Sequence, residues 1–197
     1  TLPGMKVPKD WMVSMDGVQK VVRINGFETL ANVCSEPLVM SRRLENIDSN
    51  MEKVELTFRR AKRWKSVILA RSVALSKNPL VSAADSGLPV TSDNAQDVIR
   101  YLSDFEATNQ TTIPFVRSIN RIGWFGNEFY PFKLDSEIVF EHEQGELSSL
   151  LQAFEKTGSK EAWITAAAKV REEPFARALL AASFASPLLE PLKHRVM

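Results

Sequence analysis

Five cations and one tryptophan occupy six of the seven positions of the segment RRAKRWK, residues 59–65, and no acidic residue interrupts them. Lysine and arginine side chains bind the phosphate oxygens of nucleic acids, and an exposed indole can stack on a base. With a second basic pair nearby, the candidate nucleic-acid-binding residues are Arg59, Arg60, Lys62, Arg63, Trp64, Lys65, Arg42 and Arg43. A short basic run is weak evidence alone, and an ordinary solvated turn between two strands is the alternative.

Trp64 itself allows two roles. It can stack on a base, which contributes ~1–3 kcal/mol per base in single-strand binders. It can also pack in the core, because RWKSVIL begins an apolar strand and tryptophan at such a place is more often packed than offered to a ligand. The sequence favours packing. The cations around Trp64 must face solvent in either case, because burial of an unpaired cation is too costly.

Clustered carboxylates form a second candidate, in the string EHEQGE that contains Glu141, Glu143 and Glu146. Such oxygens can bind a divalent cation, and a metal-dependent nuclease or primase would need a converging set of acids. A solvated loop is the more common role of an acidic string, and the sequence offers no further converging acids. No metal site is predicted.

The sequence contains no familiar catalytic motif. It has no GxxxxGK[ST] phosphate loop, no GxGxxG turn and no GxSxG nucleophile elbow. Its two histidines, His142 and His194, and its single cysteine, Cys34, cannot form a zinc site by any known spacing. We therefore predict that this chain is not an enzyme and holds no cofactor.

The composition is that of a globular protein of 197 residues, with 44% hydrophobic and 25% charged residues. A single cysteine rules out an internal disulfide and suggests a reducing compartment. No apolar run reaches the ~18 residues of a membrane span, and the N-terminus lacks the apolar core of a signal peptide. We expect a cytoplasmic protein with no membrane partner.

Basic charge is concentrated toward the N-terminus. Residues 1–77 carry fourteen Lys and Arg against eight Asp and Glu, a surplus of six. Residues 78–197 carry eleven against sixteen, a deficit of five. This polarity can orient a protein on a polyanion or dock an acidic half onto a basic neighbour. A few exposed hairpins that happen to be rich in lysine and arginine are the alternative.

The hydrophobic period changes near residue 78. Val54, Leu56 and Phe58 alternate with polar residues, and SVILARS follows the basic segment, which predicts a long hairpin with RRAKRWK at its tip. Later segments approach a period of 3.6, which predicts helices in SDNAQDVIRYLSDFEATN, capped by Ser92 or Asp93, and over residues 146–158, 159–173 and 174–189. We predict an α+β fold, with an antiparallel β-rich basic lobe over residues 1–77 and a mixed, mainly helical lobe over 78–197, unless the two form one domain.

Nearly the whole chain, from about Trp11 onward, resembles a bacterial prophage and mobile-element family known as domain of unknown function 927. The resemblance rests on the order of several segments: KVELTFRRAKRWKSVILARSVALSKNPLVSAADSGLPVTSDNAQDVIRYLSDFEATN, RIGWFGNEFYPF, GSKEAWI and RALLAASFASPLLEPL. The signature pieces are the aromatic-basic RW hairpin, the Ser-Gly-Leu-Pro-Val turn, the YL helix with its following Asn, and the GW strand at Gly123 and Trp124.

The resemblance implies a place in phage and plasmid replication. Proteins of this family look like replication helicases in which this domain precedes an AAA+ ATPase core, with the Walker A loop expected a short way past SPLLEPL. The parent protein would be an ATP-dependent DNA helicase, with ATP and Mg expected only in that downstream domain. The implied partners are DNA, single-stranded or forked, the downstream ATPase, and further copies of the chain. The family offers no catalytic residues to transfer to this region.

A protein–protein assembly module is the rival function. In that case the basic lobe packs on an acidic neighbour, and FARALLAASFASPLL positions subunits of a helicase ring. Exposure of residues 175–189 would favour an interface, whereas burial would make them core.

Overall fold

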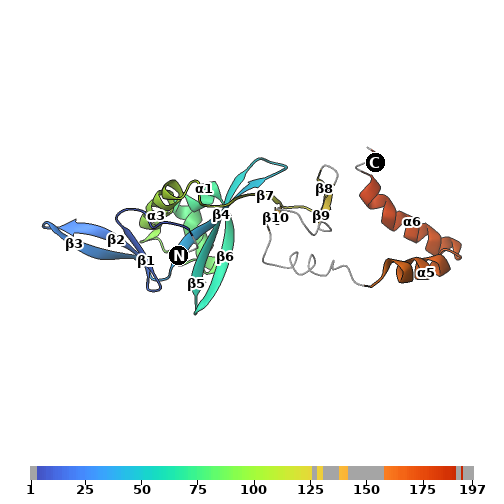
Figure 1. Ribbon diagram of the computed structural model, residues 1–197, viewed down its shortest axis with the longest axis horizontal. Coiled ribbons are helices and arrows are strands. Elements are labelled where there is room, and N and C mark those ends of the chain that lie inside the picture. Colours follow the sequence, from blue (N-terminus) through green and yellow to red (C-terminus); the bar gives the residue numbers. More distant parts are fainter. Residues whose placement is uncertain (1–3, 126–127, 131–137, 142–157, 190–191, 193–197) are drawn as a thin grey trace. The chain divides into compact units, whose positions relative to one another are not determined.

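The computed structural model describes residues 4–125, 128–130, 138–141, 158–189 and 192. These residues belong to two compact units, Thr1–Asn120 with Glu137–Glu141, and Arg121–Ser136 with His142–Met197. The expected division between residues 77 and 78 does not coincide with these units. Strand-rich structure precedes helical structure along the chain, so the predicted α+β class is confirmed (Figure 1).

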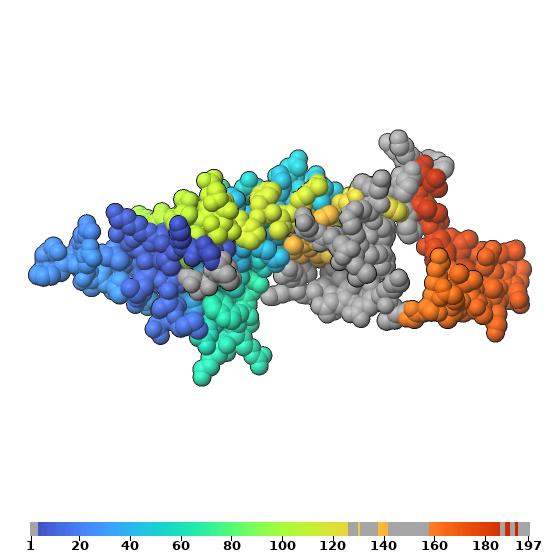
Figure 2. Space-filling view, in the orientation of Figure 1, coloured from blue at the N-terminus to red at the C-terminus, as the bar shows by residue number. Residues whose placement is uncertain are grey.

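A three-stranded antiparallel sheet begins the first unit. Its strands are β1 (Trp11–Ser14), β2 (Gly17–Ile24) and β3 (Phe27–Cys34), in the spatial order β1-β2-β3. The turn between β2 and β3 is Asn25-Gly26, a dipeptide that favours a two-residue hairpin loop. The outer part of this hairpin extends from the body of the unit and carries exposed Ile24 and Phe27 (Figures 1 and 2).

A five-stranded sheet forms the centre of the same unit. Its strands are β4 (Leu38–Asn46), β5 (Glu52–Arg60), β6 (Arg63–Ala70), β7 (Phe115–Ile119) and β10 (Val139–Phe140), in the order β10-β7-β4-β5-β6. The β4–β5 and β5–β6 pairs are antiparallel, whereas β7 pairs in parallel with both β4 and β10. The central sheet is therefore mixed.

Short helices connect this sheet to the longest helix of the unit. They are α1 (Arg71–Ala74), α2 (Lys77–Ser82), the 3-10 turn η1 (Ala83–Ser86) and α3 (Ala95–Thr108). The helix predicted in SDNAQDVIRYLSDFEATN is α3. Of the apolar stripe that its sequence predicts, Ala95, Val98, Leu102 and Phe105 are buried and Ile99 is half-buried, and buried Tyr101 joins them. The predicted cap at Ser92 or Asp93 is wrong, because α3 begins one residue later, after Asn94.

One core joins the helices to the strands. The alternation in β5 is confirmed, since Val54, Leu56 and Phe58 are all buried. Tyr101 of α3 lies against Trp11, with ring centroids 5.3 Å apart, and donates a 2.7 Å hydrogen bond to the carbonyl oxygen of Leu38. Apolar contact and a satisfied hydroxyl together fix α3 on the sheet.

The described residues of the second unit form a short hairpin and two helices. They are β8 (Gly123–Phe125), β9 (Glu128–Tyr130), α5 (Lys160–Val170) and α6 (Pro174–Leu188). Ser159 caps α5, as its oxygen accepts a 3.0 Å hydrogen bond from the amide of Ala162. The sequence predicts a helix over residues 146–158, and all of these residues except Gly158 lie outside the described part of the chain.

Candidate nucleic-acid interface

The β5–β6 hairpin carries the basic segment at its tip. Strand pairing runs from Lys53 opposite Ala70 to Arg60 opposite Arg63, which leaves Ala61 and Lys62 as a two-residue turn. Both turn residues have positive φ, 49° at Ala61 and 65° at Lys62. A two-residue turn of this kind matches the right-handed twist of the strands. The predicted hairpin and the placement of RRAKRWK at its tip agree with the structure.

The cations of the tip face solvent. Arg60, Lys62, Arg63 and Lys65 are exposed, and Arg59 is half-buried. Among the described residues, none of these five cations forms an ion pair with a carboxylate. The tip is therefore a concentration of positive charge that forms no ion pair with an acid of the described chain.

Strand alternation distributes these side chains over both faces of the hairpin. Arg59 lies opposite Trp64, and the next pair on that face is Thr57 with Ser66. The other face carries Arg60 opposite Arg63, then Lys65 opposite Phe58. Because successive side chains of a strand point to opposite faces, a polyanion can meet cations from either side of the tip.

Trp64 does not pack in the core, and the packing role favoured by the sequence is wrong. Its side chain is 55% exposed. Val67 and Leu69 contact the core, and a period of two places Trp64 on the opposite face of β6. The positions of Val67 and Leu69 already contained this information, so the error came from judging Trp64 by residue type instead of by strand phase.

Arg42 lies in the middle of the sheet, away from the tip. Its Nε and Nη2 donate to the Glu55 carboxylate at 2.6 and 2.9 Å, and Ser41 Oγ donates to the same group at 2.7 Å. Burial opposes ionisation of Glu55, but the hydrogen bonds from Arg42 and Ser41 and the charge of Arg42 outweigh it and lower the pKa of this carboxyl. Arg42 is thus committed to a buried acid.

Arg43 is also engaged within its own unit. Its Nη2 donates a 2.9 Å hydrogen bond to the carbonyl oxygen of Gln110, and its guanidinium lies over the ring of Phe115. Its strand partner is Val54, six residues before Arg60, which is roughly 20 Å along a strand at ~3.3 Å per residue. The structure therefore brings Arg59–Lys65 together and separates Arg42 and Arg43 from them.

Glu141 is a buried carboxylate with several hydrogen-bond partners, a role that the sequence did not indicate. Its carboxylate accepts hydrogen bonds from Asn46 Nδ2 and Ser118 Oγ, both at 2.8 Å, and pairs with Lys53 Nζ. Burial opposes ionisation of Glu141, but the bonds from Lys53, Asn46 and Ser118 outweigh it and lower its pKa. The expectation of a solvated loop is wrong for Glu141, while Glu143, Glu146 and His142 lie outside the described residues.

The Glu141 cluster serves the sheet. Its polar atoms are hydrogen-bonded to one another and connect β4, β5 and β7 to the end of β10. The cluster therefore has a structural role in the sheet. No group of three or more His, Cys, Asp or Glu that could hold a metal ion occurs within the described part of the chain.

Comparison with known families gives one result. The family model described as Domain of unknown function (DUF927) matches residues 12–197. The chain belongs to this family. The match includes the β5–β6 hairpin, the Glu141 cluster and helices α5 and α6, so all of them are parts of the DUF927 domain. None of the curated proteins matches the sequence.

None of the described helices of this domain is long and apolar enough to cross a membrane.

Proposed function

We propose that this DUF927 chain is a non-catalytic DNA-binding domain that engages the phosphate backbone through the tip of its β5–β6 hairpin. The carrying observation is the set of five cations at the tip, exposed Arg60, Lys62, Arg63 and Lys65 with half-buried Arg59, which form no ion pair with an acid among the described residues. Phosphate contacts of this kind provide affinity without sequence preference. Arg42 and Arg43 are left out, because Glu55, Gln110 and Phe115 already engage them.

The turn chemistry supports a functional role for this tip. The β2–β3 hairpin uses Asn25-Gly26, with φ of 51° and 82°, and these residue types tolerate positive φ with little strain. The β5–β6 hairpin has Ala61 and Lys62 in the same conformation. A non-glycine residue there costs about 1 kcal/mol or more. Lysine at the tip therefore lowers the stability of the hairpin but adds a positive charge, and strained backbone positions of this kind are common at functional sites.

The wider context we propose is a phage or mobile-element replication helicase. The resemblance described above supports this context, in which the domain binds DNA and positions a downstream AAA+ ATPase. Unwinding, ATP and Mg would belong to that ATPase, because this sequence has no phosphate-binding loop.

Charge-removing variants of the full chain test the DNA-binding role. In R60Q/K62Q/R63Q/K65Q the side-chain size is largely kept and four charges are lost. The matched control K9Q/K77Q/K160Q/K169Q removes four exposed lysines outside the hairpin. We expect the tip variant to lose most of its DNA affinity in fluorescence anisotropy, and its salt slope to fall by about 3, at ~0.7–0.9 per phosphate contact.

The control should bind almost as the parent does. Equal binding by the tip variant and the parent, with the same salt slope, would falsify the role of the hairpin. An equal loss in both quadruple variants would mean that the total charge of the chain, and no local site, drives binding.

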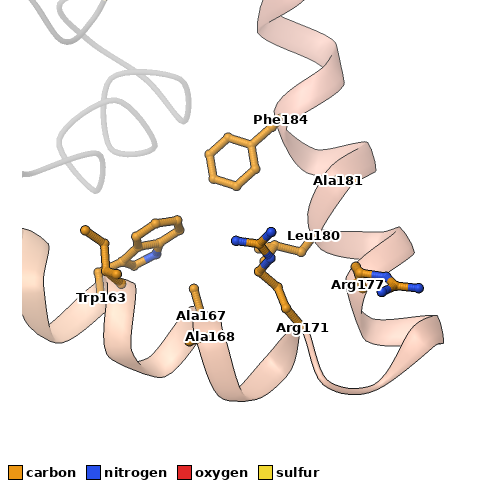
Figure 3. Close-up of a pocket in the computed structure, with 9 residues that line it drawn as sticks. Trp163, Ala167, Ala168, Arg171, Arg177, Leu180, Ala181 and Phe184 are labelled. Atoms are coloured by element: carbon orange, nitrogen blue, oxygen red, sulfur yellow. The ribbon is translucent and has the colours of Figure 1, made fainter.

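Subunit assembly is the second candidate, and the surface of α5 and α6 favours it. Neither helix has a buried residue among its described side chains, and Phe175 is 78% exposed. The two helices meet at Trp163 and Phe184, whose rings lie edge to face at 5.8 Å. A groove of about 360 Å³ remains between the helices (Figure 3). A helix that is apolar all round is normally covered by protein.

Light scattering of the purified chain tests assembly. If the exposed side of α6 joins subunits, the parent is an oligomer without DNA, and F175E/L179E is a monomer. The control T165E adds a charge at an exposed polar position of α5 and should leave the oligomer intact. A monomeric parent at all concentrations would remove this candidate.

A further inference from the structure

We propose that Trp64 is a base-stacking platform that makes the hairpin tip selective for single-stranded DNA over duplex DNA. The proposal rests on the DNA-binding role proposed above and names the substrate class of the same site. It is carried by the exposure of the indole, its position opposite Arg59, and the small residues next to it.

The indole is available to a ligand. Trp64 is exposed at the end of β6 and makes no ring contact with another described aromatic side chain. Its face of the hairpin points away from the core that Val67 and Leu69 contact. A large apolar ring that is 55% exposed and has cations beside it fits a planar, anionic partner.

The neighbours of Trp64 shape an open shelf. The pair that follows on the same face is Thr57 with Ser66, two small hydroxyl residues. Thr57 donates a 2.9 Å hydrogen bond to Ser41 Oγ, and Ser66 hydrogen-bonds Glu55, so both are held in the sheet. The next cross-strand pair on this face therefore adds no side chain larger than threonine beside the indole.

Arg59 provides the phosphate contact beside that shelf. It is the directly opposed cross-strand neighbour of Trp64, and such pairs have Cβ atoms about 4.5–5.5 Å apart. A base stacked on the indole would bring its own backbone within reach of Arg59, and an adjacent phosphate within reach of Lys62 in the turn. Stacking and charge therefore act on one nucleotide segment.

This arrangement discriminates between strand types. In a duplex each base face is covered by the next base pair, so the cations can bind phosphates but the indole has no base face to contact. In a single strand the base faces are accessible, and every base has one, so stacking adds affinity without sequence preference. Trp64 should therefore contribute to single-strand binding alone.

Affinity measurements on the full chain with a fluorescent oligo-dT and a duplex of equal length test the proposal. We expect Trp64→Ala to weaken oligo-dT binding about ten-fold and to leave duplex binding and both salt slopes unchanged. Trp64→Phe keeps an aromatic ring and should retain most of the affinity. Phe27→Ala removes an aromatic ring that is 77% exposed at the other hairpin tip, and it should bind both probes as the parent does.

The outcomes separate this inference from the proposed function. If Trp64→Ala weakens both probes equally, or neither, while the tip variant R60Q/K62Q/R63Q/K65Q loses binding, then stacking is refuted and the phosphate role survives. If that tip variant binds normally, or the parent binds neither probe, both proposals fail. Intrinsic fluorescence gives a second readout: oligo-dT should quench the parent, and Trp64→Phe should lose most of that quenching.

Discussion

Lys62 occupies a backbone position that favours glycine, and this single residue links the stability of the hairpin to its charge. Gly26 has the equivalent position in the β2–β3 turn, with a φ of 82° against 65° at Lys62. Both hairpins thus have two-residue turns with positive φ, formed by different residue types. A comparison between them measures what the cation costs the fold.

Exchange of the two residues gives a paired prediction. Lys62→Gly should raise the free energy of unfolding by about 0.5–1 kcal/mol, because glycine adopts positive φ without strain. Gly26→Lys should lower it by a similar amount, since nothing lies within 4 Å of the new Cβ and only the backbone is strained. Urea denaturation checks both. A Lys62→Gly variant that is no more stable than the parent would show that the turn is not strained.

Cys34 is the only thiol in the chain, and it is inaccessible in the folded state. Its side chain is buried, and its Sγ lies 3.2 and 3.3 Å from the carbonyl oxygens of Glu36 and Pro89. Burial raises the pKa of this thiol to about 11, so almost no thiolate is present at pH 8.

A thiol-reactive dye therefore tests the packing around Cys34. At pH 8 we expect the folded chain to react far more slowly than the urea-denatured chain, with a rate that rises as denaturant is added. Rapid reaction of the native chain would mean that β3 opens readily from the core beside Pro89.

At the scale of elements, Glu141 fastens a very short strand. β10 has two residues, and its pairing with β7 is Val139 opposite Ser118 and Phe140 opposite Ile119. The amide of Glu141 adds one more bond, 2.9 Å to the Ile119 carbonyl oxygen. So little backbone pairing cannot hold a strand alone, and the side-chain contacts of Glu141 supply the rest.

Removal of this carboxylate should destabilise the first unit. Glu141→Ala leaves Lys53, Asn46 and Ser118 without their shared acceptor, and we expect a loss of roughly 3 kcal/mol, as for a broken buried ion pair. Glu28→Ala is the control, because its ion pair with Arg23 is exposed and such pairs contribute about 0–1 kcal/mol. Equal small losses in both variants would contradict the fastening role.

Glu141 and Glu55 also predict how stability depends on pH. Their neighbours lower the pKa of both carboxyls below the ordinary value of 4.5. A carboxyl with a lowered folded-state pKa stabilises the fold fully above its unfolded-state pKa, and this contribution is lost as the pH falls through the folded-state value. The unfolding free energy should therefore decline as the pH falls below about 4.5.

In Glu141→Gln the unfolding free energy should decline less steeply with falling pH than in the parent, because the amide does not titrate. Parallel melts of the parent and the variant from pH 7 to pH 2.5 provide the measurement. An equally steep decline of stability at low pH in both proteins would show that Glu141 does not contribute to the pH dependence.

At the scale of the whole molecule, the two units differ in how they bury apolar side chains. The first has a shared core of strands and helices, in which Leu56 has no exposed surface. In the second, α5 and α6 contact each other through Trp163 and Phe184, and Leu179 is 58% exposed. Most of the described apolar burial therefore belongs to the first unit.

A matched pair of truncations tests this difference. Leu56→Ala should lower the free energy of unfolding by about 2–5 kcal/mol, the usual cost of a buried leucine. Leu179→Ala should change it by less than about 0.5 kcal/mol, as exposed substitutions do. Urea denaturation of dilute chain provides both values. A large loss for Leu179→Ala that grows with protein concentration would instead support assembly through α6.

Local patterns predicted much of this architecture. The period of two in Val54, Leu56 and Phe58 was sufficient for the hairpin and its basic tip, and the stripe from Ala95 to Phe105 was sufficient for α3. Asn25-Gly26 is an equally clear local signal for the β2–β3 turn. These features depend on residues close together in the chain, where backbone geometry sets which side chains share a face.

The tertiary structure decided which residues of the candidate site remain available. RRAKRWK is a hairpin tip by sequence, but the fold shows Trp64 in solvent and Arg42 held by Glu55, which faces it only because the β4–β5 register shifts between Met40 and Arg42. Glu141 meets Asn46 and Lys53 across 95 and 88 positions of sequence. Such pairings follow from strand order and register, which depend on long-range contacts and have no periodic signature in the chain.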